Sequence, residues 1–316
     1  MMLRVLGVVA SLIIGSAQAA WPEKPIKVLI GYAPGGSTDV VGRLIAPHLQ
    51  AKLGQPIVIE NKPGGAGDFA AEMMLQQPAD GYTLMLTTVA VHAINPGLYK
   101  SQKFHPIADF TPVALVCSYP MILIGSPQTT FKTMAELKDL AARQPTFYSS
   151  SGVGSPGHLS GELLVRGISA SITHVPYKGG SPSVLAVMSG EAQLNFATLP
   201  AVTPQIRGNK VRAIGLASKE RNPAVPDVPT MIELGLPDFD VGTWTGFVGP
   251  KGLPQEVVTR LNAAVAAVLA DPVVRQRLVD EGAEIRTMSP ADFGAFMRAE
   301  NVRWVKVVRD AGITPQ

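Results

Sequence analysis

The chain has 316 residues, of which 46% are hydrophobic and 16% charged, and its formal net charge is +3. A chain of this length and composition can bury a large core and is long enough for two domains. The sequence contains no basic run, which argues against a nucleic-acid partner. Its 31 glycines and 27 prolines are spread along the chain, which predicts many tight turns and excludes a low-complexity tract.

The N-terminus carries the pattern of an export signal. Arg4 precedes a short apolar run at residues 5–14, and Ala17-Gln18-Ala19 has the A-x-A form of a cleavage site. The apolar run is too short to span a bilayer, and a buried N-terminal helix is the alternative interpretation. We expect residues 1–19 to be a signal peptide that is removed after Ala19. The mature protein is expected in the periplasm, with no membrane span.

Strand and helix patterns alternate along the rest of the chain, which predicts an α/β fold with a mostly parallel sheet. Strands are expected at residues 26–30, 57–60, 83–87, 113–117, 121–124, 146–149, 172–175, 193–196, 211–217 and 241–248. Helices are expected at residues 38–53, 66–76, 134–143, 157–167, 180–189, 255–270, 272–281 and 290–310.

A proline-rich connector at residues 222–229 indicates how the chain is divided into domains. It suggests that the chain leaves a first lobe, builds a second lobe and then returns, so that two crossings form a hinge. Lobe 1 is then residues 20–120 plus 226–316, and lobe 2 is residues 121–225. A single contiguous α/β domain fits the sequence almost as well.

A glycine-rich turn near the mature N-terminus is the most informative local feature. It reads Ala33-Pro34-Gly35-Gly36-Ser37-Thr38-Asp39 and lies between an apolar strand and an amphipathic helix. Such a turn exposes backbone N–H groups at a helix N-terminus, where the helix dipole adds positive potential. The turn can therefore hold an anion without a Lys or Arg side chain. Asp39 is expected to cap the backbone groups of its own turn.

Five loops lie where a predicted strand meets a helix or turn. In open α/β sheets, ligands bind beyond the carboxyl ends of the strands, so these loops can face one crevice. They are rich in Gly, Ser, Thr, His and Tyr and poor in charge, a composition that suits hydrogen bonding to a small polar ligand. Ordinary turn chemistry is the alternative for each loop. The loops are residues 33–39, 87–92, 149–158, 176–181 and 197–201.

Other chemistries have weaker support in the sequence. Residues 152–157 match G-x-G-x-x-G, but the acidic residue expected about 20 positions later is missing, which argues against a dinucleotide. The five histidines show no metal-ligand spacing, and Cys117 lies in a strand-like run typical of a buried, inert thiol. Ser155 and His158 are more typical of local helix capping than of a catalytic pair. We expect no cofactor, no metal and no catalysis.

Ten short motifs, taken in order, resemble the extracytoplasmic solute receptors of tripartite tricarboxylate transporters, the TctC or Bug family. Each motif is weak alone, but the ordered set covers nearly the whole mature chain. The matching stretches are residues 21–26, 33–39, 53–56, 60–64, 80–84, 92–96, 109–113, 174–179, 226–230 and 311–313.

The resemblance implies a two-lobed, type II periplasmic binding fold with a ligand cleft between the lobes. It implies a monomeric receptor that captures a small organic carboxylate and hands it to the membrane permease subunits of a tripartite transporter. The alternatives are a secreted α/β enzyme acting on a carboxylate or ester, and an orphan receptor that presents its ligand to a membrane sensor.

The expected ligand-binding residues combine the loops with the positions that match the family. Relatives often carry Asp where this chain has Ala197, which predicts a preference for carboxylates without an amine. The expected residues are Tyr32, Ala33, Gly35, Gly36, Ser37, Asp39, Thr87, Thr88, His92, Ser151, Gly152, Ser155, His158, Tyr177, Lys178, Gly179, Ala197 and Thr198.

Overall fold

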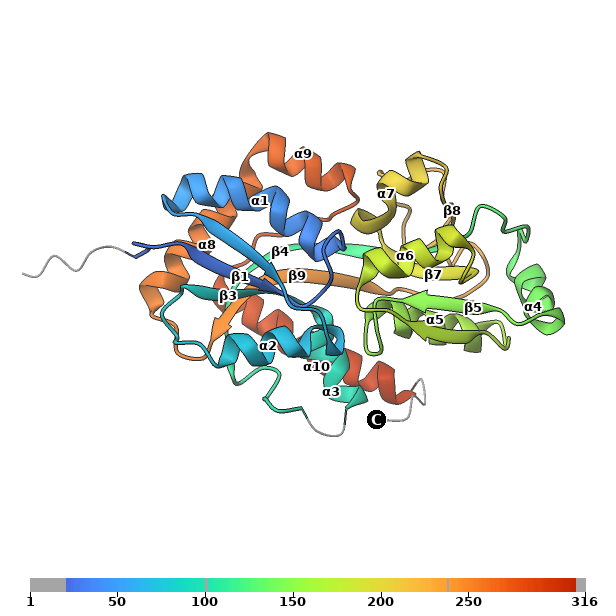
Figure 1. The fold of residues 1–316 in the computed structure, drawn as a ribbon, viewed down its shortest axis with the longest axis horizontal. Helices are drawn as coiled ribbons and strands as arrows, with labels where there is room; N and C mark the ends of the chain where they lie inside the picture. Colours follow the sequence, from blue (N-terminus) through green and yellow to red (C-terminus); the bar gives the residue numbers. More distant parts are fainter. Residues whose placement is uncertain (1–20, 100–101, 238, 311–316) are drawn as a thin grey trace, which may run out of the picture.

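The computed structural model describes residues 21–99, 102–237 and 239–310, so the predicted signal peptide lies outside the described residues. Two lobes lie side by side, and the long strands β4 (Phe110–Gly125) and β9 (Gly242–Pro250) run between them (Figure 1). The strands of the described residues are ordered β2-β1-β3-β9-β4-β7-β5-β6, and β8 pairs with β4 off this path.

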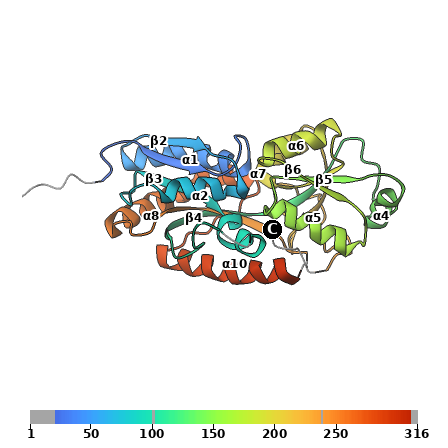
Figure 2. The same cartoon turned by 60° about the horizontal axis from the view of Figure 1, so that its bottom comes forward.

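The first lobe is a sheet covered by helices on both faces. β1 (Ile26–Ile30) pairs in parallel with β2 (Ile57–Asn61) and β3 (Thr83–Thr88), and β9 runs antiparallel to β3 and β4. One face packs against α1 (Ser37–Leu53), α8 (Gln255–Ala270) and α9 (Pro272–Asp280). The other face carries η1 (Gly65–Gly67), α2 (Asp68–Leu75), η2 (Ala90–Ile94), α3 (Asn95–Leu98) and α10 (Pro290–Asp310) (Figure 2).

The second lobe is built on the far end of β4. That end runs antiparallel to β7 (Leu194–Thr198) and β8 (Arg212–Ala217), and β5 (Phe147–Ser150) lies parallel to β7 and β6 (Thr173–Pro176). The helices of this lobe are α4 (Met134–Arg143), α5 (Pro156–Gly167), α6 (Gly180–Ser189) and α7 (Leu199–Arg207).

β4 is one continuous strand where the sequence predicted two. Its first part, as far as Pro120, pairs with β9, and Met121 to Gly125 pair with β7 and β8. Pro120 lies where the strand changes partners, a position that tolerates a residue without an N–H. Among the described residues four strand pairs are parallel and four antiparallel. The expectation of a mostly parallel sheet is therefore wrong, because β4 and β9 are long antiparallel strands.

The segment that follows the proline-rich connector pairs with β8 of the second lobe. Leu216 of β8 accepts a hydrogen bond from Met231 N at 2.7 Å and donates one to Pro229 O at 2.8 Å. Val241 N donates to Ala217 O at 3.0 Å. Residues 229–231 thus lie against β8 of the second lobe, and we propose to place the second crossing at residues 241–242 instead of near 225.

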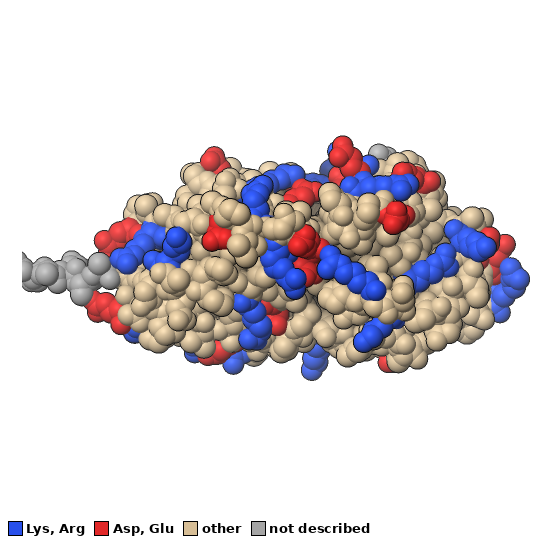
Figure 3. All heavy atoms as spheres, turned by 90° about the horizontal axis from the view of Figure 1, so that it is seen from above, with Lys and Arg blue, Asp and Glu red and all other residues tan. Residues whose placement is uncertain are grey.

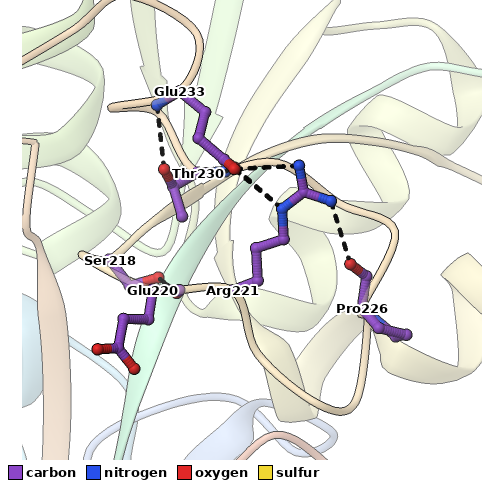
Figure 4. Close-up of polar contacts among 6 residues, drawn as sticks. All are labelled: Ser218, Glu220, Arg221, Pro226, Thr230 and Glu233. Atoms are coloured by element: carbon purple, nitrogen blue, oxygen red, sulfur yellow. Dashed lines mark hydrogen bonds and ion pairs between the residues drawn. The ribbon is translucent and has the colours of Figure 1, made fainter.

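Arg221 anchors this returning segment from within the proline-rich connector (Figure 4). Its Nε donates to both carboxylate oxygens of Glu233, at 3.1 and 3.0 Å, and its Nη1 donates to Pro226 O at 3.4 Å. Thr230 Oγ1 accepts from Glu233 N at 3.1 Å. The connector is therefore an ordered turn in the second lobe.

The predicted inert thiol is buried, and so are two tryptophans. Cys117 is fully buried, and this burial raises the pKa of its thiol. Trp244 and Trp304 belong to the same core cluster. No single helix of the described residues is long and apolar enough to cross a membrane. Only α8 and α9 taken together are long and apolar enough, and the two helices meet at a bend of 74°.

Candidate functional site

A cavity of about 40 Å³ lies between the lobes where the two crossing strands meet them. We call it the interlobe cavity. Among the described residues that line it, none carries a charge, and most present a hydroxyl group or a glycine backbone. The lining residues are Tyr32, Gly36, Ser37, Thr38, Thr88, Tyr119, Met121, Ser151, Pro156, Gly180, Ser183, Phe196, Ala197, Thr198 and Thr243.

Four helices begin at this cavity: α1 from the first lobe and α5, α6 and α7 from the second. The N-cap residues Gly36, Gly179 and Thr198 make no side-chain capping hydrogen bond, whereas Ser155 caps α5 by accepting from His158 N. The first-turn N–H groups of three helices are thus left without a side-chain acceptor, and each helix N-terminus carries positive potential. The arrangement favours an anion in the cavity.

On the face shown in Figure 3, acidic and basic side chains are mixed, and wide areas carry neither. The positive potential described above comes from the helix ends that line the cavity.

Asp39 holds the glycine-rich turn, as the sequence predicted. Its Oδ2 accepts from Gly35 N at 2.9 Å, and the carboxylate also accepts from Arg43 Nε at 2.9 Å and Asn61 Nδ2 at 3.0 Å. Burial alone would raise the pKa of Asp39, but these hydrogen bonds outweigh it and hold the pKa below its ordinary value of 3.8. Asp39 is therefore an engaged carboxylate and not a free partner for a ligand ammonium.

Removal of this carboxylate should destabilise the fold. We expect Asp39→Ala to lower the free energy of unfolding by about 2–3 kcal/mol at pH 7, because Gly35 N–H and Asn61 lose a buried acceptor. Because the folded pKa is depressed, the contribution is present above about pH 4 and is lost as pH falls through the folded pKa. Urea unfolding at pH 7 and pH 3 measures both effects.

Glu60→Ala provides the matched control, since Glu60 pairs with Lys27 and Lys62 at the surface. Loss of an exposed pair costs less than about 1 kcal/mol. Equal losses in the two variants, or an Asp39→Ala loss that persists at pH 3, would contradict the assigned role.

Two tyrosines brace the cavity wall. Tyr32 Oη donates to Ala66 O at 2.9 Å and lies 3.2 Å from Thr88 Oγ1. Tyr119 Oη donates to Ser37 Oγ at 3.2 Å. Burial raises the pKa of both phenols, which are therefore neutral. The sequence pattern gives no signal for Tyr119, because residues 118–120 lie between the two strands that it predicts.

The predicted site residues fall into three groups in the structure. Seven line the interlobe cavity: Tyr32, Gly36, Ser37, Thr88, Ser151, Ala197 and Thr198. Gly152, Tyr177 and Lys178 line a second cavity of about 160 Å³, which also includes Tyr32 and Ser151 in its wall. The remaining eight line neither of these cavities: Ala33, Gly35, Asp39, Thr87, His92, Ser155, His158 and Gly179.

His92 and Thr87 are the clearest departures from the expected site. Thr87 Oγ1 lies 2.9 Å from His92 Nε2, and His92 Nδ1 lies 2.6 Å from Pro106 O. Burial lowers the pKa of His92 to about 4. Asn301 of α10 donates to His92 O at 2.7 Å and covers η2 from outside. The strand-to-helix pattern placed His92 at a crevice, but α10 closes over this turn and makes it core.

Ser155 and His158 form the predicted local cap. Ser155 Oγ accepts from His158 N at 3.2 Å, and His158 Nδ1 accepts from Gly154 N at 3.3 Å. The His158 ring also stacks on His174, with centroids 4.2 Å apart. These contacts hold the loop at residues 149–158 in place.

The lobes touch on both sides of the interlobe cavity through glycines. A Cβ at Gly179 would lie 2.9 Å from Ala33 N, and a Cβ at Gly154 would clash with Asn95 Oδ1. Tyr99 Oη donates to Val153 O at 3.4 Å across the same boundary.

At about 40 Å³ the cavity has room for roughly three water molecules. An organic acid therefore needs the lobes to separate before it binds.

The comparisons with known proteins decide the family. The family model described as "Tripartite tricarboxylate transporter family receptor" matches residues 41–313. The chain belongs to this family. The chain is also similar to protein BugT of Bordetella pertussis, with 32% identity over 320 residues that cover 98% of each chain.

Solved structures agree with this assignment. An R. palustris protein with adipate is 36% identical, with a TM-score of 0.90 over 94% of this chain and 100% of that chain. MatC from Rhodopseudomonas palustris with bound malate is also 36% identical, with a TM-score of 0.86 over 91% of this chain and 100% of that chain. The chain therefore has the expected two-lobed, type II periplasmic binding fold of the TctC receptors, with its cleft between the lobes.

Proposed function

We propose that this chain is a periplasmic receptor that binds a small organic carboxylate between its lobes and delivers it to a tripartite tricarboxylate-type permease. The observation that carries the proposal is the convergence of four helix N-termini on one uncharged, hydroxyl-lined cavity. Backbone N–H groups and helix dipoles stabilise a carboxylate at such a position. Export through residues 1–19 and action as a monomer are part of the same proposal.

The relatives support the ligand class. The two R. palustris proteins carry adipate and malate, and both are organic acids with two carboxyl groups. We propose that one carboxylate lies at the N-termini of α1 and α6, close to Ser37, Thr38 and Gly180. Thr88, Ser151 and Thr198 would add hydroxyl groups. Thr87, His92, Ser155, His158 and Asp39 then support the loops without touching the ligand.

A thermal-shift screen of mono-, di- and tricarboxylates tests this proposal. A ligand at a hundredfold excess over its Kd should raise the Tm of the mature protein by about 4 °C. Mass spectrometry should recover that ligand unchanged after incubation. Conversion of the acid would favour the secreted-enzyme alternative, and no shift with any carboxylate would contradict the proposed ligand class.

The transporter partnership needs its own test. Deletion of the receptor should abolish uptake of the identified acid in cells that retain the permease subunits. Normal uptake in the deletion strain, with loss of a transcriptional response to the acid, would favour the orphan receptor that serves a membrane sensor.

A further inference from the structure

The second cavity adjoins the interlobe cavity. Tyr32 and Ser151, one from each lobe, lie in the walls of both. The second cavity is lined by Gly31, Tyr32, Gly64, Gly65, Ala66, Tyr99, Ser151, Gly152, Val153, Tyr177 and Lys178. A ligand held at the helix N-termini can therefore extend past Tyr32 into a compartment of about 160 Å³.

Lys178 gives this second compartment a different electrostatic character. It is the one charged residue among the described residues that line either compartment. Its side chain is exposed, and within residues 21–99, 102–237 and 239–310 it makes no ion pair or side-chain hydrogen bond. Lys27, Lys62 and Lys103 of the first lobe, by contrast, each have a carboxylate partner. Lys178 is thus a free cation at the end of an otherwise neutral binding channel.

We infer that Lys178 is a specificity-determining residue that selects ligands with a second anionic group, placed in the second cavity. The inference rests on the proposed function, because it takes the first carboxylate to lie at the helix N-termini. One end of the ligand meets neutral N–H and hydroxyl donors, and the other end meets a full positive charge. A second carboxylate is stabilised by the positive charge of Lys178, whereas a methyl group at that end is not.

Calorimetry with paired acids of equal chain length tests the inference. The pairs are butyrate with succinate, pentanoate with glutarate, and hexanoate with adipate, each titrated at pH 7. The wild type should bind the best diacid about two- to fivefold more tightly than its monoacid partner, the size expected for an exposed ion pair. Lys178→Met should remove this preference by weakening the binding of the diacid more than that of the monoacid, and Lys178→Arg should retain it.

Lys138→Met is the matched control. Lys138 is an exposed residue on α4, at the end of the second lobe remote from the cavity (Figure 1), and its loss changes the net charge by the same amount. This variant should keep the diacid preference. Raising NaCl from 50 to 500 mM should weaken the preference in the wild type and leave Lys178→Met unaffected, because screening acts on the exposed charge pair.

The outcomes separate the inference from the proposed function. Binding of no acid by the wild type overturns the proposed function itself. Binding of monoacids and diacids with equal affinity overturns the inference alone. An unchanged diacid preference in Lys178→Met, or an equal loss in Lys138→Met, also overturns the inference and leaves the proposed carboxylate site in place.

Discussion

Gly154→Ala should weaken ligand binding by roughly five- to a hundredfold without unfolding the protein. A Cβ at this position would clash with Asn95 Oδ1 of the other lobe when the lobes are closed. Overpacking of this kind costs about 1–3 kcal/mol, and the open form avoids it. Calorimetry measures the affinity, and small-angle scattering with saturating ligand should show that the variant compacts less than the wild type.

Gly190→Ala separates this effect from backbone strain. Gly154 and Gly190 have nearly the same φ, 83° and 82°, but a Cβ at Gly190 meets nothing within 4 Å. Both variants should lose similar folding stability, and only Gly154→Ala should lose affinity. Adding Asn95→Ala to Gly154→Ala removes the clashing atom and should restore part of the affinity. Equal affinity losses in the two glycine variants would disprove a role for this contact in closure.

Carboxylates without an amine should bind at least about a hundredfold more tightly than the matching amino acids. Ala197 lines the interlobe cavity, and no acidic residue is found among the described residues of its lining. An ammonium held there without an anionic partner costs several kcal/mol. Calorimetry should therefore rank succinate above aspartate and glutarate above glutamate.

An acid introduced at Ala197 should reverse part of this selection. Ala197→Asp places a carboxylate in the cavity, so it should weaken succinate binding and strengthen aspartate binding. Ala197→Asn has nearly the same shape without the charge, and it should leave the ranking of the two acids unchanged. Tighter binding of aspartate than of succinate by the wild type would contradict the account of the cavity.

The helix starts are predictable because they have local signals. The sequence predicts that Asp39 caps the backbone groups of its own turn, and Asp39 does accept from Gly35 N–H. Ser155 was predicted as a local cap and is one. These features depend on residues that are close in the sequence, so they can be predicted from the sequence alone.

The remaining features depend on contacts between distant segments. His92 is buried because α10, some 200 residues later, covers it. Tyr119 enters the cavity because β4 continues past Pro120 and pairs with three other strands. The crossing that we propose at residues 241–242 rests on the pairing of Leu216 with residues 229 and 231. Local patterns carry no signal for such long-range pairing.

A crystal structure of the mature protein with its tightest-binding acid would show where the carboxylate lies. We expect closed lobes and a carboxylate within hydrogen-bond distance of the backbone N–H groups at the starts of α1 and α6. A carboxylate bound elsewhere, or held chiefly by a Lys or Arg side chain with these N–H groups facing water, would contradict this expectation.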